Sequence, residues 1–307
     1  MNINMNINIL YFYIHMSKNY IFINSFYGGF KEKTDANHMG YFETIFQKTY
    51  LKDIEVTDDF NKANILFESC FGNSMTNYKP WSKKIFFSGE SWYRDTSQYD
   101  VILESSYTSG KTVDLPLFVV YVLNNPGFYE RLIERPLKTR ETIPTKFCCI
   151  CVSNGGCFVR NKMFEIINSY KKVDSFGNHN NNVGYVVPGP YWSEEYLNYI
   201  KQYKFIICME NSKSDTYVTE KIVNAYFANS VPIYWGTSHV KNIFQQFLYL
   251  ENENDISSYM DVLEKVKELD QDDEKYLEFI NKPVFNKDYF DENYSIDAVA
   301  NKINQLL

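Results

Sequence analysis

Histidine is scarce in this chain, and its cysteines follow no metal-binding or disulfide pattern. Only four of the 307 residues are histidines, and they form no HExxH motif and no triad-like spacing. The six cysteines do not form the CxxC…CxxC pattern, with two such motifs, that is typical of a zinc site. Three of them fall within the apolar run from Lys146 to Val152. This pattern disfavours a histidine-based hydrolase, a zinc site and a disulfide framework, and it predicts reduced cysteines in the core.

A long hydrophobic run is also missing. Asparagines interrupt the apolar residues of the N-terminal stretch, and no run approaches the ~18–20 apolar residues that a membrane span needs. We therefore predict a soluble, cytoplasmic protein without a signal peptide or transmembrane segment, and Met1, Met5 and Met16 stay open as its start. A net charge of −7 disfavours nucleic acid as a partner.

The segment from Tyr203 to Gly236 predicts a strand, a loop, a helix and a second strand. Lys204–Met209 and Val231–Trp235 are apolar runs of strand length, and Thr219 is a suitable N-cap for the helix between them. Three apolar positions recur at helical spacing: Ile222, Ala225 and Tyr226. Such a unit implies a parallel right-handed crossover, with a ligand crevice beyond the carboxyl end of the first strand.

The first turn of that helix carries charges that suit a nucleotide diphosphate. Lys221 adds a positive charge where free backbone N–H groups already favour an anion. Glu220 is a poor phosphate neighbour, but its carboxylate can accept both ribose hydroxyls. Asn211 and Tyr217 add neutral hydrogen-bonding groups to the preceding loop. The alternative is an ordinary capped surface helix, which the motif alone does not exclude.

A second strand, loop and helix precede this unit. Lys146–Val152 reads as a core strand, and the Gly-containing turn after it leads into a helix that begins near Arg160. A guanidinium at that point can bind phosphate oxygens bidentately. In the N-terminal half, Lys84–Phe87 predicts another strand. Gly89 is expected to let the chain turn there, so that Glu90 is presented at the strand's carboxyl end.

Together these segments resemble the α1,3/α1,4-fucosyltransferase family, in a microbial or viral form. The resemblance rests on YVTEKI at Tyr217–Ile222, on Ser153, Asn154 and Arg160, on VDSFG at Val173–Gly177, and on Gly89–Ser91. It covers most of the chain from about Tyr20 onward. No proline follows Ser91, unlike in the family pattern, which affects the expected acceptor contacts more than the carboxylate of Glu90.

The resemblance implies an α/β protein of GT-B architecture, with two Rossmann-like domains facing across a cleft. We expect an acceptor-binding domain at 1–138 and a GDP-fucose-binding domain at 139–290, joined near Pro136–Pro144. A last helix at 291–307 is expected to cross back to the first domain. Further strands are predicted at Tyr20–Asn24, Asn64–Glu68 and Val101–Glu104, with a helix at Tyr41–Tyr50.

Two helical stripes near the C-terminus predict packing rather than chemistry. They are Ile256, Tyr259, Leu263 and Val266, and then Ile296, Val299, Ile303 and Leu306. The acidic run at 270–274 is interpreted as a solvated turn between helices rather than a metal site.

By the same resemblance, the chain is expected to transfer L-fucose from GDP-fucose to O3 of GlcNAc in a glycan, with inversion and with Glu90 as general base. Arg160, Lys221 and the helix N-terminus can balance the leaving diphosphate, so no metal is required and a divalent ion acts at most as a stimulator. Ser153 and Asn154 join the donor-binding set. Another nucleotide sugar, a non-catalytic glycan-binding role, and transfer to O4 or to the glucose of lactose all remain open.

Aromatic residues make up 18% of the chain, which suits sugar-stacking surfaces and core packing equally. Those nearest the predicted base or on the Phe26–Gly29 loop are the acceptor-side candidates. They are Trp92, Tyr93 and Tyr27.

Overall fold

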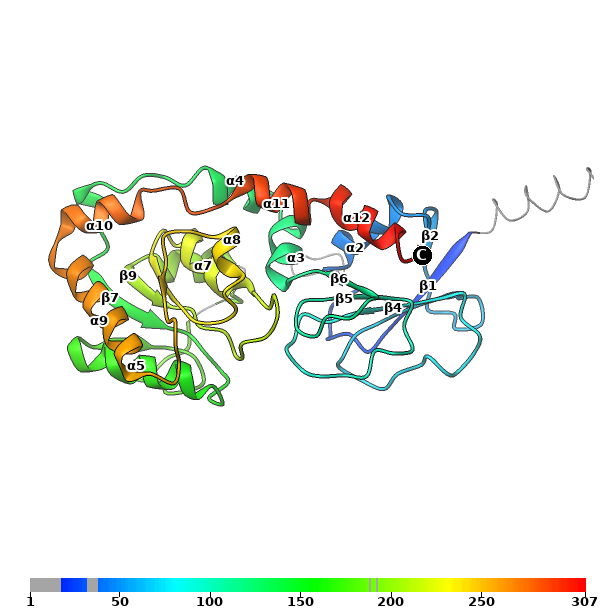
Figure 1. The fold of residues 1–307 in the computed structure, drawn as a ribbon, viewed down its shortest axis with the longest axis horizontal. Coiled ribbons are helices and arrows are strands. Elements are labelled where there is room, and N and C mark those ends of the chain that lie inside the picture. Colours follow the sequence, from blue (N-terminus) through cyan, green and yellow to red (C-terminus); the bar gives the residue numbers. More distant parts are fainter. Residues whose placement is uncertain (1–17, 32–37, 188, 192) are drawn as a thin grey trace, which may run out of the picture.

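The computed structural model describes residues 18–31, 38–187, 189–191 and 193–307, and in these it contains two parallel β-sheets (Figure 1). The first sheet has the strand order β2-β1-β3-β4-β5-β6, and the second has the order β11-β10-β9-β7-β8. Every strand pairing within both sheets is parallel. The predicted α/β class is therefore confirmed. Parallel sheets carry their ligand sites beyond the carboxyl ends of their strands.

The strands of the first sheet are β1 (Asn19–Asn24), β2 (Ile54–Val56), β3 (Ile65–Glu68), β4 (Lys83–Phe87), β5 (Val101–Glu104) and β6 (Thr112–Asp114). Those of the second are β7 (Lys146–Ile150), β8 (Val173–Ser175), β9 (Tyr203–Ile207), β10 (Val231–Tyr234) and β11 (Leu248–Tyr249). The helices of the first half are α2 (Met39–Gln47), α3 (Leu117–Asn124) and α4 (Phe128–Ile133), followed by the 3-10 turn η1 (Arg140–Thr142). The second half has α5 (Phe158–Tyr170), α6 (Glu194–Ile200), α7 (Glu220–Phe227), α8 (Val240–Ile243), α9 (Ile256–Gln271), α10 (Asp273–Ile280), α11 (Lys287–Tyr294) and α12 (Ile296–Asn304).

Most predicted elements are present with small boundary errors. The strands predicted in the first half lie within one residue of β1, β3, β4 and β5. The strands β3 and β5 are buried along their whole length, as their apolar runs indicate. Strands β7 and β9 end two residues earlier than predicted, although Cys208 and Met209 beyond β9 stay buried. The edge strands β2 and β6 were not predicted, since each has only three residues.

One apolar cluster includes residues of both sheets. Phe42 of α2 packs against Phe67 and Phe87, with ring centroids 5.0 and 4.7 Å away. The same buried cluster contains Ile222 and Tyr226 from α7 of the second sheet. Helix α3 lies between the sheets (Figure 1) and contacts α7. The two halves are therefore packed against one another rather than joined only by a linker.

Gly89 has a different role from the predicted one. The glycines with positive φ among the described residues are Gly29, Gly127, Gly184 and Gly189. At Gly89 a Cβ would instead lie 2.8 Å from Leu117 Cδ1, at the start of α3. Gly89 has no positive φ, so the prediction that it provides a special turn conformation was wrong, and its lack of a side chain leaves room for the Leu117 side chain at the start of α3.

The predicted C-terminal stripes are buried except at one end. Tyr259, Leu263 and Val266 are buried in α9, but Ile256 is 54% exposed because it is the first helical residue and lies at the end of the packed face. In α12, Val299 and Ile303 are fully buried. The prediction that Ile256 belongs to the packed stripe was wrong.

The acidic run at 270–274 also differs in part from the prediction. Asp272 caps α10 by accepting hydrogen bonds from the N–H groups of Glu274 and Lys275, which fits a turn between helices. Asp270, however, is buried and pairs with Lys171 and Lys204. Its predicted solvation was therefore wrong, because two lysines from other elements cover it.

The cysteines are all free thiols, and four of the six are buried. Burial raises the pKa of the thiols of Cys149 and Cys208, which favours their protonated form. The other two, Cys70 and Cys151, are half-buried. Among the described helices, none combines the length and the apolar character needed to cross a membrane.

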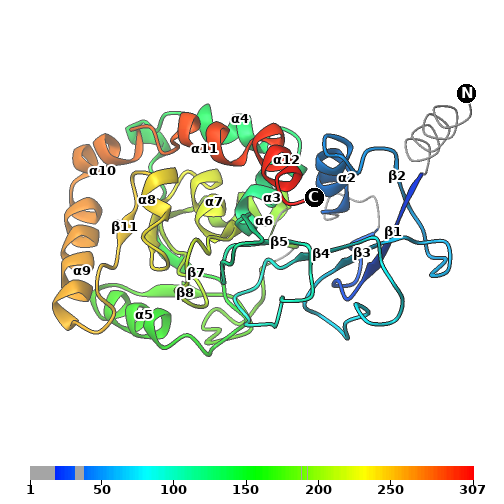
Figure 2. The same cartoon turned by 45° about the vertical axis from the view of Figure 1, so that its right-hand side comes forward.

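Helices α11 and α12 run from the second sheet back to the first, and α12 ends beside α2 (Figure 2). The backbone N–H of Tyr50 donates to Asn304 Oδ1 at 2.8 Å, and Lys83 Nζ donates to the carbonyl of Leu307 at 2.7 Å. Lys48 and Asp297 form an exposed ion pair.

We predict that Ile303→Ala lowers the free energy of unfolding by about 2–5 kcal/mol, since it leaves a cavity between α12 and the first sheet. Urea denaturation measures this change. The control Asp297→Asn removes only the exposed pair with Lys48 and should cost less than about 1 kcal/mol. Equal, small effects of both substitutions would show that α12 does not stabilise the first sheet.

A second prediction concerns Glu104 at the end of β5. This carboxyl group is 2% exposed and its Oε1 has no hydrogen-bond partner. Burial, and then the nearby charge of Asp215, raise the pKa of Glu104 to about 7. Because the folded pKa exceeds the unfolded one, folding is favoured at low pH and loses stability as the pH rises through 7.

Glu104→Gln should therefore raise the free energy of unfolding at pH ~8 by on the order of 3 kcal/mol, and by less than ~1 kcal/mol at pH ~5. Urea denaturation at both pH values tests this. A gain that is equal at both pH values would mean that Glu104 is already ionised in the folded protein.

Candidate functional site

A buried carboxylate lies at the carboxyl end of the second sheet. Glu210 follows β9 and is fully buried. Its Oε1 accepts hydrogen bonds from the N–H of Thr219 at 2.8 Å and from the hydroxyl of Tyr234 at 3.4 Å. Its Oε2 accepts from Lys221 Nζ at 3.1 Å and from Thr219 Oγ1 at 2.8 Å. These four residues are called the Glu210 cluster below.

The Glu210 cluster fixes the start of α7. Thr219 is the N-cap, as predicted, and its hydroxyl accepts from the N–H of Lys221 while it donates to Glu210. Lys221 Nζ also lies 4.0 Å from Glu220 Oε1. Burial lowers the pKa of Lys221, but the carboxylates of Glu210 and Glu220 outweigh that effect and raise it overall, so the ammonium stays charged.

Arg160 lies beneath the adjoining loops rather than on the surface. It is in the first turn of α5 and is 1% exposed. Its guanidinium donates to Asn211 Oδ1 at 2.9 Å, to the Met209 carbonyl at 3.2 Å, and to the Asn154 carbonyl at 2.5 Å. Arg160 therefore joins the turn after β7 to the loop after β9, with both of its terminal nitrogens already bonded to protein oxygens.

Ser153 and Asn154 are exposed on the turn after β7. Asn154 Oδ1 accepts from the N–H of Gly156 at 2.8 Å and so shapes the turn. Gly177, the last residue of the VDSFG motif, packs on the start of this turn, since a Cβ there would lie 2.0 Å from the Val152 carbonyl oxygen. The motif therefore has a packing reason to lack a side chain at that position.

Glu90 approaches the same region from the first sheet. The carbonyl oxygen of Glu90 accepts from the hydroxyls of Ser88 and Ser106, at 3.2 and 3.3 Å, which holds the backbone after β4. Partial burial raises the pKa of Glu90. The positive charge of Lys221 lowers it, and the negative charges of Glu220 and Glu210 raise it further. The carboxyl group therefore shares an electrostatic environment with the start of α7, across the two sheets.

Direct hydrogen bonds connect the sheets beside this region. The N–H of Thr216 donates to the Ser105 carbonyl at 2.9 Å, and the N–H of Phe118 donates to the Val218 carbonyl at 3.2 Å. Asp215 accepts from both the N–H and the hydroxyl of Thr108 at 3.0 Å. The loop between β9 and α7 is thus fixed against the loop that follows β5.

The structure brings together the predicted donor-side residues of the second half. Arg160 and Asn211 are hydrogen-bonded to each other, and Lys221 is within reach of Glu220. Tyr217 is buried nearby, and burial and the charge of Glu210 raise the pKa of its hydroxyl. Ser153 and Asn154 border this group through the contact of Asn154 with Arg160.

The predicted acceptor-side aromatics divide into two groups. Trp92 and Tyr93 are exposed on the segment after Glu90, and Trp92 contacts Phe71 at a ring distance of 5.9 Å. Tyr27 is half-buried beside Phe71, and its hydroxyl hydrogen-bonds His38 Nδ1 at 2.7 Å. Burial raises the pKa of Tyr27 to about 12, so it acts as a neutral group.

Sequence reasoning missed Glu210 and therefore treated Lys221 as an unpaired positive charge. The available signal was a carboxylate directly after the apolar run of β9, a position that faces the crevice of a parallel sheet. A charged residue there needs a partner if it is buried. Lys221, eleven residues later, supplies that partner.

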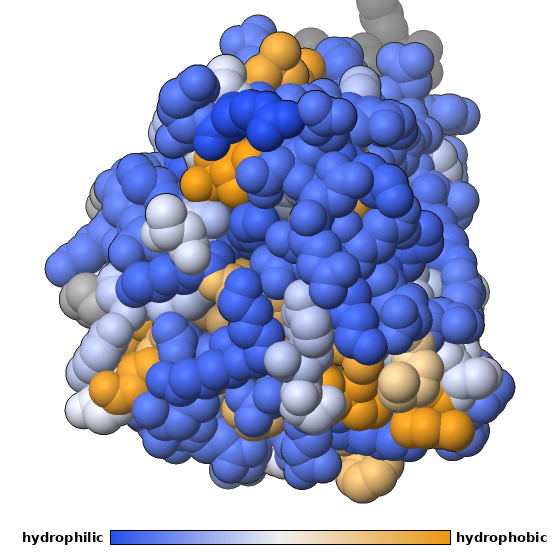
Figure 3. Space-filling model, turned by 90° about the vertical axis from the view of Figure 1, so that its left-hand side faces the viewer, coloured by the Kyte–Doolittle hydropathy of each residue, from blue (hydrophilic) through white to orange (hydrophobic). Residues whose placement is uncertain are grey.

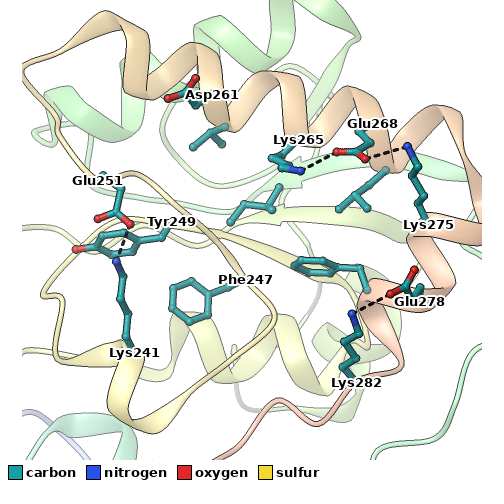
Figure 4. A pocket seen from close by; sticks show the side chains of 14 residues that line it. Lys241, Phe247, Tyr249, Glu251, Asp261, Lys265, Glu268, Lys275, Glu278 and Lys282 are labelled. Carbon is teal, nitrogen blue, oxygen red and sulfur yellow. Dashed lines mark hydrogen bonds and ion pairs between the residues drawn. The ribbon is translucent and has the colours of Figure 1, made fainter.

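A pocket of about 620 Å³ lies elsewhere, between α9, α10 and β11 (Figure 4). Phe247 and Tyr249 form part of its lining, and ion pairs surround it, among them those of Lys265 with Glu268 and of Lys282 with Glu278. The described residues that line it include none of the predicted site residues. The outer face of this half carries only separated hydrophobic groups on a largely hydrophilic surface (Figure 3).

We predict that Glu210→Gln lowers the free energy of unfolding by about 3–5 kcal/mol, because it leaves the Lys221 ammonium without its buried counter-charge. The control Glu220→Gln changes a carboxylate that is 4.0 Å from the same ammonium and partly exposed, and it should cost less than about 1 kcal/mol. Urea denaturation separates the two. An equally small effect at both positions would mean that the pair of Glu210 and Lys221 does not stabilise the folded protein.

Comparison with known proteins identifies the second half of the chain. Residues 142–292 match the C-terminal domain of glycosyltransferase family 10 (fucosyltransferase). Protein R654 of Acanthamoeba polyphaga mimivirus, a candidate fucosyltransferase, is 28% identical over 233 residues, which are 72% of this chain and 37% of that protein. The α-(1,3)-fucosyltransferase FucT of Helicobacter pylori is 32% identical over 165 residues, which are 52% of this chain and 33% of that protein. The matched part of the chain thus spans about a third of the length of these relatives.

The fold agrees with solved structures over nearly the whole chain. A crystal structure of an α1,3-fucosyltransferase with GDP-fucose superimposes with a TM-score of 0.69 at 20% identity, covering 94% of this chain and 90% of that one. A further crystal structure of an α1,3-fucosyltransferase gives a TM-score of 0.73. At this level of identity the likeness establishes the GT-B fold, with its two α/β domains. Residues 142–292 of this chain are therefore assigned to the C-terminal domain of glycosyltransferase family 10, the fucosyltransferases.

Proposed function

We propose that this chain transfers L-fucose from GDP-fucose to O3 of GlcNAc in an N-acetyllactosamine-type glycan, with inversion at the anomeric carbon. The observation that carries the proposal is the placement of Glu90, from the first sheet, within the electrostatic range of Lys221 and Glu220 at the start of α7. A base on one domain thereby faces a nucleotide-binding helix start on the other. Residues 1–138 would bind the acceptor, and residues 139–290 would bind the donor.

The donor side is supported by the charges around α7 and α5. Lys221 and Arg160 carry positive charge, and the N-terminus of α7 adds its partial charge. Glu210 balances part of that positive charge through its ion pair with Lys221. Glu220, 15% exposed at its side chain, is free to accept the ribose hydroxyls. Solved relatives with this fold bind GDP and GDP-fucose.

The remaining donor-side roles follow from position. Ser153 and Asn154 present exposed groups beside the guanidinium of Arg160, and Tyr217 and Asn211 border the same space. Because both terminal nitrogens of Arg160 already bond protein oxygens, we assign it the role of holding the two loops and supplying charge from beneath. A bidentate contact of Arg160 with phosphate, which its sequence position suggested, would require the guanidinium to give up these bonds to protein oxygens when the donor binds.

In the proposed reaction, Glu90 accepts the proton of the acceptor hydroxyl as that oxygen attacks the anomeric carbon. The bond from that carbon to the β-phosphate oxygen breaks on the opposite face, which inverts its configuration. The developing negative charge on GDP is balanced by Lys221, Arg160 and the α7 N-terminus. Trp92, Tyr93 and Tyr27 are proposed to contact the acceptor. We propose that transfer needs no metal ion.

We predict that Glu90→Gln lowers kcat by ~10²–10⁴-fold and leaves GDP binding intact, because it removes the base but keeps the shape of the side chain. Fucose transfer to N-acetyllactosamine, measured with EDTA present, tests the activity. The shift of the melting temperature by GDP tests binding. Glu130→Gln, at an exposed position on α4, is the matched control and should transfer at the wild-type rate.

The pH profile gives an independent test of the same residue. Since burial raises the pKa of Glu90, the acid limb of kcat/KM should fall at a higher pH than the ordinary glutamate value of about 4.3. Loss of transfer below that limb reflects protonation of the base. The same acid limb in Glu90→Gln would assign the base to another group.

The donor and acceptor assignments have separate controls. A melting shift with UDP but not GDP would indicate another nucleotide sugar. GDP binding without transfer, in wild type as in Glu90→Gln, would indicate a non-catalytic glycan-binding protein or a different acceptor. Product analysis distinguishes transfer to O3 of GlcNAc from transfer to O4 or to the glucose of lactose.

A further inference from the structure

A second pocket, of about 510 Å³, lies beside β5 of the first sheet. Two loops form it: residues 93–97, which follow β4, and residues 107–111, which connect β5 to β6. The hydroxyl of Tyr107 donates to the carbonyl of Ser91 at 3.3 Å, one residue beyond Glu90. The pocket is thus a direct neighbour of the proposed base.

Two tyrosine rings form the most exposed wall of this pocket. Tyr93 is 76% exposed and Tyr107 is 39% exposed, and their rings meet edge to face at 5.5 Å. Because the two exposed rings touch each other, they form a small contiguous aromatic surface, and such surfaces on a folded protein favour binding more than isolated exposed rings do. Aromatic faces beside hydrogen-bonding groups suit a sugar ring, whose C–H face is apolar and whose edge carries hydroxyls.

The two cations in the pocket lining are already bonded to protein carbonyls, which disfavours a phosphate or another anion as the ligand. Arg94 donates to the carbonyls of Ser69 and Gly72, at 2.8 and 2.6 Å, so its charge is directed away from the pocket. Lys111 Nζ donates to the carbonyl of Tyr99 at 3.0 Å. The carboxylate of Asp95 remains in the lining, and the N–H of Ser97 lowers its pKa by bonding the ionised form.

Hydroxyl groups complete the lining. They belong to Thr96, Ser97, Thr108 and Ser109. A carboxylate and several hydroxyls beside two aromatic faces match a neutral ligand rich in hydroxyl groups. A peptide or lipid ligand would require a larger apolar area.

The pocket is also connected to the donor side. Thr108, in its lining, donates through both its N–H and its hydroxyl to Asp215. Asp215 belongs to the loop between β9 and α7, which carries Asn211 and Tyr217. A ligand in the pocket would therefore contact a loop that is hydrogen-bonded to the loop between β9 and α7.

We propose that this pocket is an acceptor subsite for a sugar residue beyond the one that receives fucose, with Tyr93 and Tyr107 contacting the sugar ring and Asp95 accepting from its hydroxyls. This inference rests on the proposed function, because it places the reacting sugar at Glu90. It implies that the chain prefers acceptors longer than a disaccharide.

The test compares kcat/KM for an N-acetyllactosamine disaccharide with that for a tetrasaccharide of two such units. Wild type should prefer the tetrasaccharide. Tyr107→Ala should reduce that preference by about tenfold, through KM rather than kcat, while the disaccharide and the melting shift with GDP stay near wild type. Tyr93→Ala, at a residue already proposed to contact the acceptor, should lower kcat/KM for both acceptors, and about tenfold more for the tetrasaccharide. Tyr93→Phe keeps the ring and should retain the preference.

Tyr50→Ala is the matched control, since Tyr50 has the same 76% exposure as Tyr93, follows α2 and is not part of the pocket lining. The proposal is overturned if wild type uses both acceptors equally, or if the alanine variants lower both acceptors to the same extent.

Failure of the proposed function gives a different result. If no transfer occurs to either acceptor, calorimetric binding of the tetrasaccharide to wild type and to Tyr93→Ala decides the question. Binding that is lost in the variant would support the pocket as a glycan site while rejecting the reaction. Equal binding to both proteins, or binding to neither, would overturn the subsite.

Discussion

The ion pair between Glu210 and Lys221 is the interaction on which the candidate site depends. A fully buried carboxylate is costly unless it is paired and hydrogen-bonded, and here one carboxylate accepts from a backbone N–H, two hydroxyls and an ammonium. Those bonds hold the first turn of α7 against the end of β9. Lys221 and Glu220 are therefore presented in one fixed arrangement, and the positive charge of Lys221 is retained in a partly buried position.

The apolar cluster that spans both sheets positions the part of the candidate site that comes from the first sheet. Residues of α2, α3 and α7 belong to one apolar cluster, so the carboxyl edges of both sheets are held at one place. Gly89 lacks a side chain because α3 packs there, which brings the segment of Glu90 close to the second sheet. Hydrogen bonds from Thr216 and Thr108 then fix the two loops on either side. The proposed base and the proposed donor site are thus positioned by the packing of the core.

The sequence predicted those features that depend on local pattern. Buried strands, the Thr219 cap and the helix of Ile222 and Tyr226 follow from apolar periodicity and cap chemistry, which act over a few residues. The pairing of Glu210 with Lys221 could not be predicted in the same way, since it depends on how the loop between β9 and α7 brings the first turn of α7 back to the end of β9. The burial of Asp270 and the role of Gly89 were misread for that reason, because each depends on an element distant in sequence.

A crystal structure with GDP-fucose and an acceptor disaccharide bound would test most directly whether Lys221 and Glu90 face each other across the reacting sugars. We expect the diphosphate to lie against Lys221 at the N-terminus of α7. We expect the reacting hydroxyl to lie within hydrogen-bond distance of the Glu90 carboxylate, on the opposite side of the fucose ring. A diphosphate bound away from α7, or a reacting hydroxyl that contacts a different base, would contradict this arrangement.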